Sequence, residues 1–258
     1  MERRRFVLVL AAGVLGAAVG RGTAGLVEEP RELVARGRLV APAAAQPPGT
    51  LLPPRGVVDR LPGDGARIAL TIDDGTNPAV VGAFTALAAE TGLRLTFFPN
   101  GCYRSWTDHA QALRPLVESG QVALGNHTWS HPDLRTLDDA AVAAEITRNR
   151  RFLADTFGAG RTPFFRPPYG SRDERVDRIA ADCGHPTVAM WEGTLADHRV
   201  LTADELLAAA RRWFAAGSIV IGHANHATVT TVFDELTALL DDRALESVTL
   251  ADVWAHPA

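Results

Sequence analysis

Residues 68–75 read IALTIDDG: a largely apolar run from Ile68 to Ile72 leads directly into two aspartates and a glycine. An uninterrupted apolar run of this length is typical of a strand buried on both faces, as in a parallel sheet. Active sites of parallel α/β folds lie at the carboxyl ends of the strands, which is where the aspartates fall. Asp-Asp-Gly is also a common turn sequence, so its meaning depends on the other strands.

Similar runs and helical stretches fill the rest of the chain. Further short apolar runs occur at 95–98, 122–124, 164–165, 188–191, 219–221 and 248–250. Between them, apolar residues recur three and four apart, which predicts helices around 80–87, 142–157, 206–214 and 232–240. This alternation predicts an α/β fold with a parallel sheet. The pattern alone leaves open either an incomplete barrel of about seven strands or an open doubly wound sheet.

The first part of the chain reads as a targeting signal rather than as part of the fold. Residues 1–5 are basic and residues 6–20 are apolar. Fifteen helical residues span only about 22 Å, less than the roughly 30 Å of bilayer hydrocarbon. We therefore expect residues 1–24 to be a cleaved export signal, of the general secretory type or, given Arg3-Arg4-Arg5-Phe6-Val7, of the twin-arginine type. An uncleaved anchor is the remaining alternative.

The expected mature protein lies in the cell envelope or outside the cell, with no membrane segment of its own. Residues 25–60 are rich in proline and lack periodicity, which predicts a linker or an irregular arm. The regular pattern begins at residue 61, so we place the catalytic domain at 61–258.

Composition excludes several classes of function. The formal net charge is −4, which argues against a nucleic-acid-binding protein. The chain has no lysine, so it carries neither a Schiff-base lysine nor a lysine-dependent phosphate loop. Its two cysteines, Cys102 and Cys183, are predicted to lie near opposite ends of the strands, and we expect no disulfide between them.

Polar residues follow the other strands as well. The relevant segments are Asn126–His131, Arg166–Tyr169, Glu192–Asp197 and Gly222–His223. Each has an ordinary structural explanation when taken alone, such as a turn or a rigid proline loop. Five polar clusters at strand ends on one face, however, predict an active site.

The residue types in these clusters suit a divalent cation. His127 and His131 are four residues apart, a spacing that lets two imidazoles bind one metal ion. One aspartate oxygen would complete a set typical of zinc, with cobalt or iron as alternatives. The second aspartate of the Asp-Asp pair would then remain free as a base.

Several of these segments resemble the motifs of the polysaccharide deacetylases, the NodB-homology domains of carbohydrate esterase family four. The segments are Thr71–Gly75, His127-x3-His131, Arg166-Pro-Pro-Tyr169 and Ile221-Gly-His223, and Phe97–Gly101 is similar to the family's second strand. The resemblance covers roughly residues 61–258. It implies a deformed barrel of about seven parallel strands and metal-dependent removal of acetyl groups from polymeric sugars.

The resemblance also implies roles for single residues. The metal ligands would be Asp74, His127 and His131. The general base would be Asp73, held ionised by Arg166, and the general acid would be His223, kept protonated by Asp197. On the substrate side, the main-chain N–H of Tyr169 would bind the oxyanion, and Ile221 would stand beside the acetyl methyl group.

The chain departs from the family in its fourth motif, D-x-x-D-W. Thr194 takes the place of the first Asp and His198 that of the Trp, so one wall of the acetyl pocket would be more polar. Trp106 and Trp129 are candidates for stacking on sugar rings. Trp191 would line the cleft or fill the core, and His226 would lie behind the acid or on the surface.

Three functions follow as hypotheses. The first is an exported deacetylase of N-acetylglucosamine polymers such as peptidoglycan or chitin. The second is an esterase that removes O-acetyl groups from xylan or a related glycan. The third is a glycan-binding protein that keeps the fold without catalysing a reaction.

Overall fold

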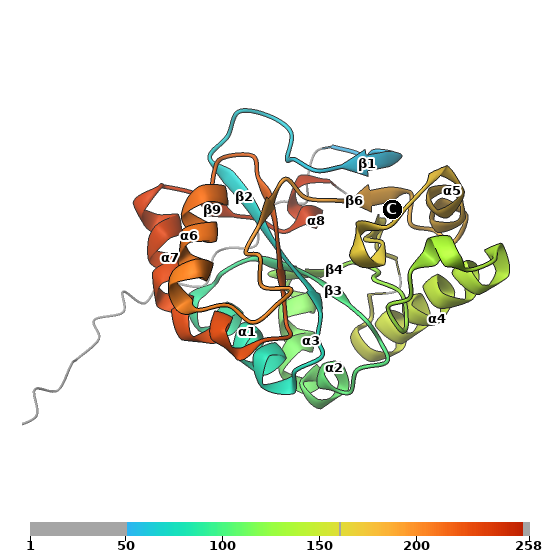
Figure 1. Ribbon diagram of the computed structural model, residues 1–258, viewed down its shortest axis with the longest axis horizontal. Helices are drawn as coiled ribbons and strands as arrows, with labels where there is room; N and C mark the ends of the chain where they lie inside the picture. Colours follow the sequence, from blue (N-terminus) through green and yellow to red (C-terminus); the bar gives the residue numbers. More distant parts are fainter. Residues whose placement is uncertain (1–50, 160, 255–258) are drawn as a thin grey trace, which may run out of the picture. The chain divides into compact units, whose positions relative to one another are not determined.

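Strand β2 (Arg67–Asp74) lies in the middle of the larger sheet and ends in the Asp-Asp pair. The computed structural model describes residues 51–159 and 161–254 (Figure 1). Strands β3 (Leu95–Pro99) and β8 (Ile219–His223) run parallel to β2 on either side, in the order β4-β3-β2-β8-β7. The register aligns Asp73 with Phe98 and His223.

A smaller parallel sheet, β1-β6-β5, completes the strand arrangement. A bridge between Asn126 and Phe165 joins the end of β4 to β5, and the chain passes from β6 directly into β7. The expected parallel α/β fold, a deformed barrel, is thereby confirmed. The remaining strands are β1 (Gly56–Val58), β4 (Val122–Leu124), β5 (Phe164–Phe165), β6 (Thr187–Ala189), β7 (Gly193–Thr194) and β9 (Glu246–Ser247).

Helices flank the strands (Figure 1), and several of them begin at side-chain caps. Asn77 accepts a hydrogen bond at the start of α1, where Pro78 takes the first position, and Gly92 ends the helix in a left-handed conformation. Thr202 and Glu205 form a capping box at the start of α6. The helices are α1 (Pro78–Thr91), α2 (Ser105–Asp108), α3 (Ala110–Glu118), α4 (Asp139–Phe157), α5 (Glu174–Asp182), α6 (Ala203–Trp213), α7 (Phe233–Asp242) and α8 (Leu250–Val253).

The alternation of side chains along β2 places the core and the site. Leu70 and Ile72 pack outward against α1, α6 and α7, in a cluster that includes Phe84, Phe214 and Leu236. Ala69 belongs to a second cluster inside the barrel, with Phe98, Phe164, Ala189 and Ile219. Thr71 and Asp73 share the face of Ala69, since alternate residues of a strand point the same way. Asp73 therefore lies inside the barrel, at the carboxyl end of β2.

Two sequence expectations are corrected by the structure. Residues 248–250 do not form a strand: β9 ends at Ser247, and Leu250 begins α8 because Thr249 and Asp252 form a capping box. Residues 56–58, expected within the linker, form β1 and pair with β6. A three-residue strand is too short for its periodicity to be recognised in the sequence.

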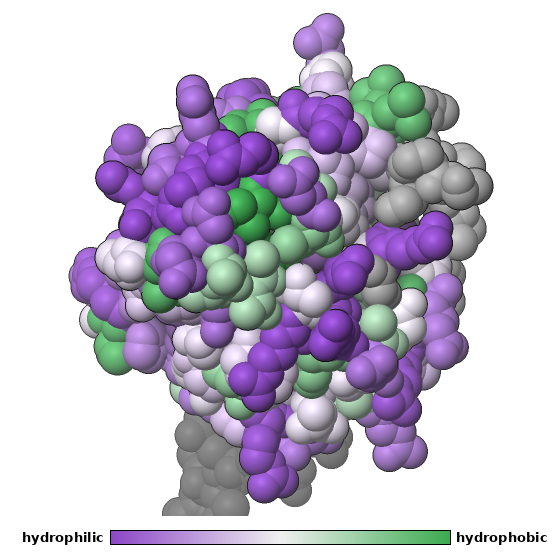
Figure 2. Space-filling view, turned by 90° about the vertical axis from the view of Figure 1, so that its right-hand side faces the viewer, coloured by the Kyte–Doolittle hydropathy of each residue, from purple (hydrophilic) through white to green (hydrophobic). Residues whose placement is uncertain are grey.

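The predicted export signal and most of the predicted linker, residues 1–50, lie outside the described residues. Within the described ranges, no helix has both the length and the apolar character needed to cross a bilayer. The side of the molecule turned toward the viewer in Figure 2 is mainly hydrophilic, with apolar side chains in small, separated patches.

Candidate active site

The polar residues predicted at the strand ends come together in space. Asp73 and Asp74 end β2, His127 and His131 lie on the loop after β4, and Arg166 follows β5. Asp197 follows β7, and His223 ends β8. The parallel strand arrangement accounts for this convergence, because all carboxyl ends lie at the same end of the barrel.

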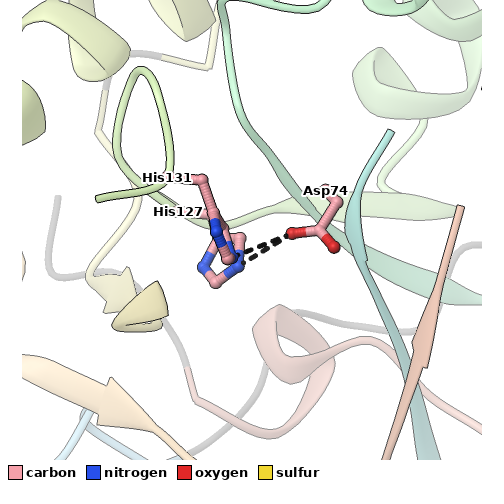
Figure 3. A group of neighbouring side chains, drawn as sticks. All are labelled: Asp74, His127 and His131. Carbon is pink, nitrogen blue, oxygen red and sulfur yellow. Dashed lines mark ion pairs between the residues drawn. The ribbon is translucent and has the colours of Figure 1, made fainter. Parts of the chain in front are cut away.

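Asp74, His127 and His131 form a compact group of potential metal ligands (Figure 3). Their ligand atoms all lie within 4.8 Å of one another. Asp74 Oδ1 is 3.2 Å from Nε2 of His127 and 3.2 Å from Nε2 of His131. Asp74 and His131 have positive φ angles of 69° and 62°, which turn their side chains into the site.

The hydrogen bonds around this group leave its ligand atoms free. His127 Nδ1 lies 2.7 Å from the carbonyl oxygen of Arg166, which can only accept, so Nδ1 carries the proton and Nε2 keeps its lone pair. Asp74 Oδ1 is buried and has no hydrogen-bond donor among the described residues. Electron pairs thus converge on one point, and a divalent cation would satisfy all of them.

The pKa values of His131 and Asp74 are both lowered. Burial, followed by the electrostatic effect of His127, lowers the pKa of His131 to about 4, so this imidazole is neutral at neutral pH. For Asp74, burial alone would raise the pKa, but the neighbouring His127 and His131 lower it far below its usual range. A neutral imidazole and an ionised carboxylate are the forms that bind metal ions.

Asp73 is paired with a buried arginine. Arg166 Nη1 donates to Asp73 Oδ1 over 2.7 Å and to Thr71 Oγ1 over 2.8 Å. The rest of the guanidinium donates to the carbonyl oxygens of Ala189 and Met190. The second oxygen of Asp73, Oδ2, is 3.6 Å from His127 Nε2. The arginine thus fixes one carboxylate oxygen and leaves the other beside the ligand group.

His223 is held by both oxygens of Asp197. Its Nδ1 lies 2.9 Å from Asp197 Oδ1, and its backbone N–H donates to Asp197 Oδ2 over 3.0 Å. Burial works against the charged imidazole, but the hydrogen bond and charge of Asp197 outweigh it and raise the pKa of His223. The pair has the geometry of a positioned proton donor.

Comparison with known proteins identifies the family. The family model described as polysaccharide deacetylase matches residues 60–188, half of the chain. The chain belongs to the polysaccharide deacetylase family. A chitin deacetylase from Arthroderma benhamiae is 27% identical over 216 residues, 81% of this chain and 57% of that protein. A peptidoglycan-N-acetylglucosamine deacetylase from Listeria monocytogenes is 27% identical over 190 residues, 74% of this chain and 39% of that protein.

The chain therefore spans less than two thirds of the length of these curated relatives. Among solved structures, a carbohydrate esterase family four pseudoenzyme from Bacillus anthracis has the same fold. Its TM-score is 0.68 at 20% identity, with 78% of this chain and 69% of that chain covered.

The residues that the family resemblance assigned to the substrate lie at different depths. Tyr169 is 72% exposed, has a φ of 59° and packs its ring edge to face against His131. His198 is exposed, with its ring centroid 6.3 Å from that of His223. Ile221 is buried, while Trp129 is half-buried between Phe152 and the guanidinium of Arg148.

Trp106 does not face the substrate, contrary to the sequence-based expectation. It is fully buried, and its Nε1 donates to the carbonyl oxygen of Asp74 over 2.8 Å. The indole packs beneath Gly75, whose φ is 98° and where a Cβ atom would lie 2.3 Å from the ring. Trp106 therefore supports the turn at Asp74 and Gly75. Trp191 is half-buried and lies over the Arg166 guanidinium, at the boundary between core and cleft.

The cysteines agree with the prediction: Cys102 and Cys183 are both free. His226 is half-buried in the loop that follows β8.

Sequence reasoning missed the asparagines of the site. Asn225 Nδ2 donates to Asp74 Oδ2 over 2.7 Å. Asn100 donates to the carbonyl oxygens of His127 and Thr128, and Asn149 donates to Asn126 Oδ1, which also accepts from the Thr128 backbone N–H. The sequence positions of two asparagines offered a usable signal. Asn126 directly precedes His127, and Asn225 lies two residues after His223. Asn149 sits within a helix, and no local pattern marks it.

Proposed function

We propose that this chain is an exported, metal-dependent hydrolase that removes N-acetyl groups from an N-acetylglucosamine polysaccharide of the peptidoglycan or chitin type. The observation that carries the proposal is the convergence of Asp74 Oδ1 with the free Nε2 atoms of two histidines, beside a carboxylate held by Arg166. Membership of the polysaccharide deacetylase family and the printed activities of the two relatives support it.

The residues divide the reaction between them. A divalent cation at Asp74, His127 and His131 would supply positive charge that polarises the acetyl carbonyl group and lowers the pKa of a water molecule. Asp73 accepts the proton of the attacking water through Oδ2, because Oδ1 is held by Arg166. Zinc suits two imidazoles and one carboxylate, with cobalt or iron as alternatives.

His223 gives the proton that the leaving group needs. An amine leaves poorly as an anion, so cleavage of an amide requires a proton donor on its nitrogen. Asp197 keeps His223 oriented through Nδ1, which leaves Nε2 to donate. The backbone N–H of Tyr169 serves the developing oxyanion, and Ile221 lies beside the acetyl methyl group.

The exposed His198 bears on which acetylated substrate the site accepts. It stands where the family has an apolar tryptophan, and its ring lies near that of the acid His223. An esterase that removes O-acetyl groups from xylan or a related glycan is the alternative. A catalytically silent binding protein is less well supported, since the side chains that we propose as base, acid and metal ligands lie close together.

Acetate release tests the proposal. The metal-loaded protein is assayed on N-acetylated chitooligosaccharides, peptidoglycan and acetylated xylan, with and without a chelator. We expect chelator-sensitive release from an N-acetylated glycan and a loss of about 10²- to 10⁴-fold in Asp73→Asn, which removes the base. Asp241→Asn, the same change on an exposed position of α7, is the control. Equal rates for Asp73→Asn and the wild type, or release from xylan alone, would contradict it.

A further inference from the structure

The two oxygens of the Asp74 carboxylate have different surroundings. Oδ1 faces the two histidine Nε2 atoms and has no hydrogen-bond donor among the described residues. Oδ2 accepts a hydrogen bond of 2.7 Å from Asn225 Nδ2. The carboxylate is thus held with one oxygen directed at the ligand group and the other directed away from it.

The amide of Asn225 is itself fixed in orientation by Thr76. The backbone N–H of Thr76 donates to Asn225 Oδ1 over 3.1 Å, and Thr76 Oγ1 donates to the same oxygen over 2.8 Å. A backbone N–H can only donate, so Asn225 Oδ1 must face Thr76 and Nδ2 must face Asp74. Thr76 therefore donates to Asn225, and Asn225 donates to Asp74, with no alternative orientation of the amide.

This chain of hydrogen bonds connects two strand ends. Thr76 follows β2 and Asn225 follows β8, two residues beyond the acid His223. Backbone bonds from Ala224 to the Asp73 carbonyl and from Asn77 to the Ala224 carbonyl hold the two segments side by side. Neither Thr76 nor Asn225 belongs to the buried core, since Thr76 is exposed and Asn225 half-buried.

We propose that Asn225 and Thr76 are positioning residues that restrict Asp74 to metal binding through Oδ1 alone. A carboxylate that is free to rotate can bind a cation with both oxygens and so fill a position that water or substrate needs. The hydrogen bond to Oδ2 opposes that rotation. The inference rests on the proposed function in requiring a cation at Asp74, His127 and His131.

The experiment measures metal binding directly, apart from activity. Zinc affinity is determined by competition with a chromophoric chelator for the wild type, Asn225→Leu, Thr76→Val and the double variant. We expect Asn225→Leu to weaken binding by about ten- to a hundred-fold, as is usual for residues that orient metal ligands. Thr76→Val should weaken it less, and the double variant should match Asn225→Leu, because Thr76 acts through Asn225.

Cobalt(II) provides a spectroscopic readout that a purely structural role would not change. The visible absorption of cobalt weakens as its coordination number rises, so binding by both oxygens in Asn225→Leu should lower the intensity. Thr231→Val is the control, since its hydroxyl bonds only the Thr228 carbonyl in the same segment after β8. It should leave affinity and spectrum unchanged.

The outcomes separate the two proposals. Wild-type affinity and an unchanged cobalt spectrum in Asn225→Leu and Thr76→Val would overturn the positioning role while leaving the proposed function intact. Additive losses in the double variant would also overturn it, because the two residues would then act independently. A wild-type protein that binds neither zinc nor cobalt would overturn both. If Asn225→Leu fails to fold, the exposed Thr76→Val still decides the question.

Discussion

Two adjacent aspartates differ in environment because of the backbone between them. Asp73 is the last residue in the regular alternation of β2 and points into the barrel, where Arg166 binds it. Asp74 has a φ of 69°, which turns its side chain toward the histidine loop instead. Trp106 and Asn100 hold this turn through the Asp74 carbonyl oxygen. The same residue type can therefore supply both the base and the metal ligand of the proposed reaction.

The Asp197–His223 pair leads to a prediction about pH. Burial lowers the pKa of His223, but Asp197 outweighs it and raises the pKa above the ordinary value. In Asp197→Asn the effect of burial remains but the negative charge of Asp197 is gone, so the His223 imidazole loses its proton at lower pH. We expect the alkaline limb of the kcat/KM profile on an N-acetylated glycan to move to lower pH.

The same pair has a defined effect on stability. Because the folded-state pKa of His223 is raised, its stabilising contribution is present below the unfolded pKa and is lost as pH rises through the folded value. Denaturation at several pH values should show this dependence in the wild type and not in Asp197→Asn. The control Asp241→Asn should keep the wild-type dependence on pH in both measurements. An alkaline limb of kcat/KM that Asp197→Asn does not move would contradict the assignment of His223 as acid.

At the scale of elements, helix α4 holds the loop of His127 and His131 through one buried asparagine. Asn149 Nδ2 donates to the Pro99 carbonyl and to Asn126 Oδ1, and Asn149 Oδ1 accepts from the Gly101 N–H. It thereby connects the end of β3 to the segment that begins the histidine loop. The loop position depends on this contact, because each partner is a buried polar group.

Asn149→Leu should therefore damage both stability and metal binding. The substitution leaves the Gly101 N–H and the Pro99 carbonyl without their partner, and each unsatisfied buried group costs about 1–3 kcal/mol. We expect the free energy of unfolding to fall by at least about 2 kcal/mol in urea denaturation, with weaker zinc binding by the folded fraction. Arg151→Leu, on the exposed face of the same helix, should change neither. Unchanged zinc affinity in a destabilised Asn149→Leu would show that α4 does not position the loop.

The sequence predicts this site well where the candidate residues stand at the end of a long strand. The strand that ends in Asp73 and Asp74 has eight residues in the structure, so the aspartates could be placed at its end. Two-residue strands such as β7 have too few residues for a period, and Trp106 looked like a loop aromatic because α2 is only four residues long. Asn225 meets Asp74 across 151 residues, a contact that only the fold specifies.

At the scale of the molecule, the parallel arrangement separates stability from function. The apolar clusters lie within the barrel and between strands and helices, whereas the polar side chains of the site gather at the carboxyl ends of β2, β4, β5, β7 and β8. At the opposite end, Arg94 forms a buried pair with Asp252 of α8. In the site, Asp74 Oδ1 and the Nε2 atoms of His127 and His131 point toward one another. The rest of the fold must hold these acceptors together against their mutual repulsion.

Metal binding should therefore stabilise the whole domain. A cation that binds the folded chain alone adds about 2.7 kcal/mol at a concentration one hundred times its Kd, which for a chain of this size corresponds to a rise in Tm of about 5–10 °C. We expect zinc to raise Tm and a chelator to reverse the rise, measured by differential scanning calorimetry. His131→Leu removes one ligand and should abolish the zinc effect while leaving the chelator without influence. An equal Tm for the wild type with zinc and with chelator would contradict a cation site at Asp74, His127 and His131, since tight binding to the folded state must appear as stability.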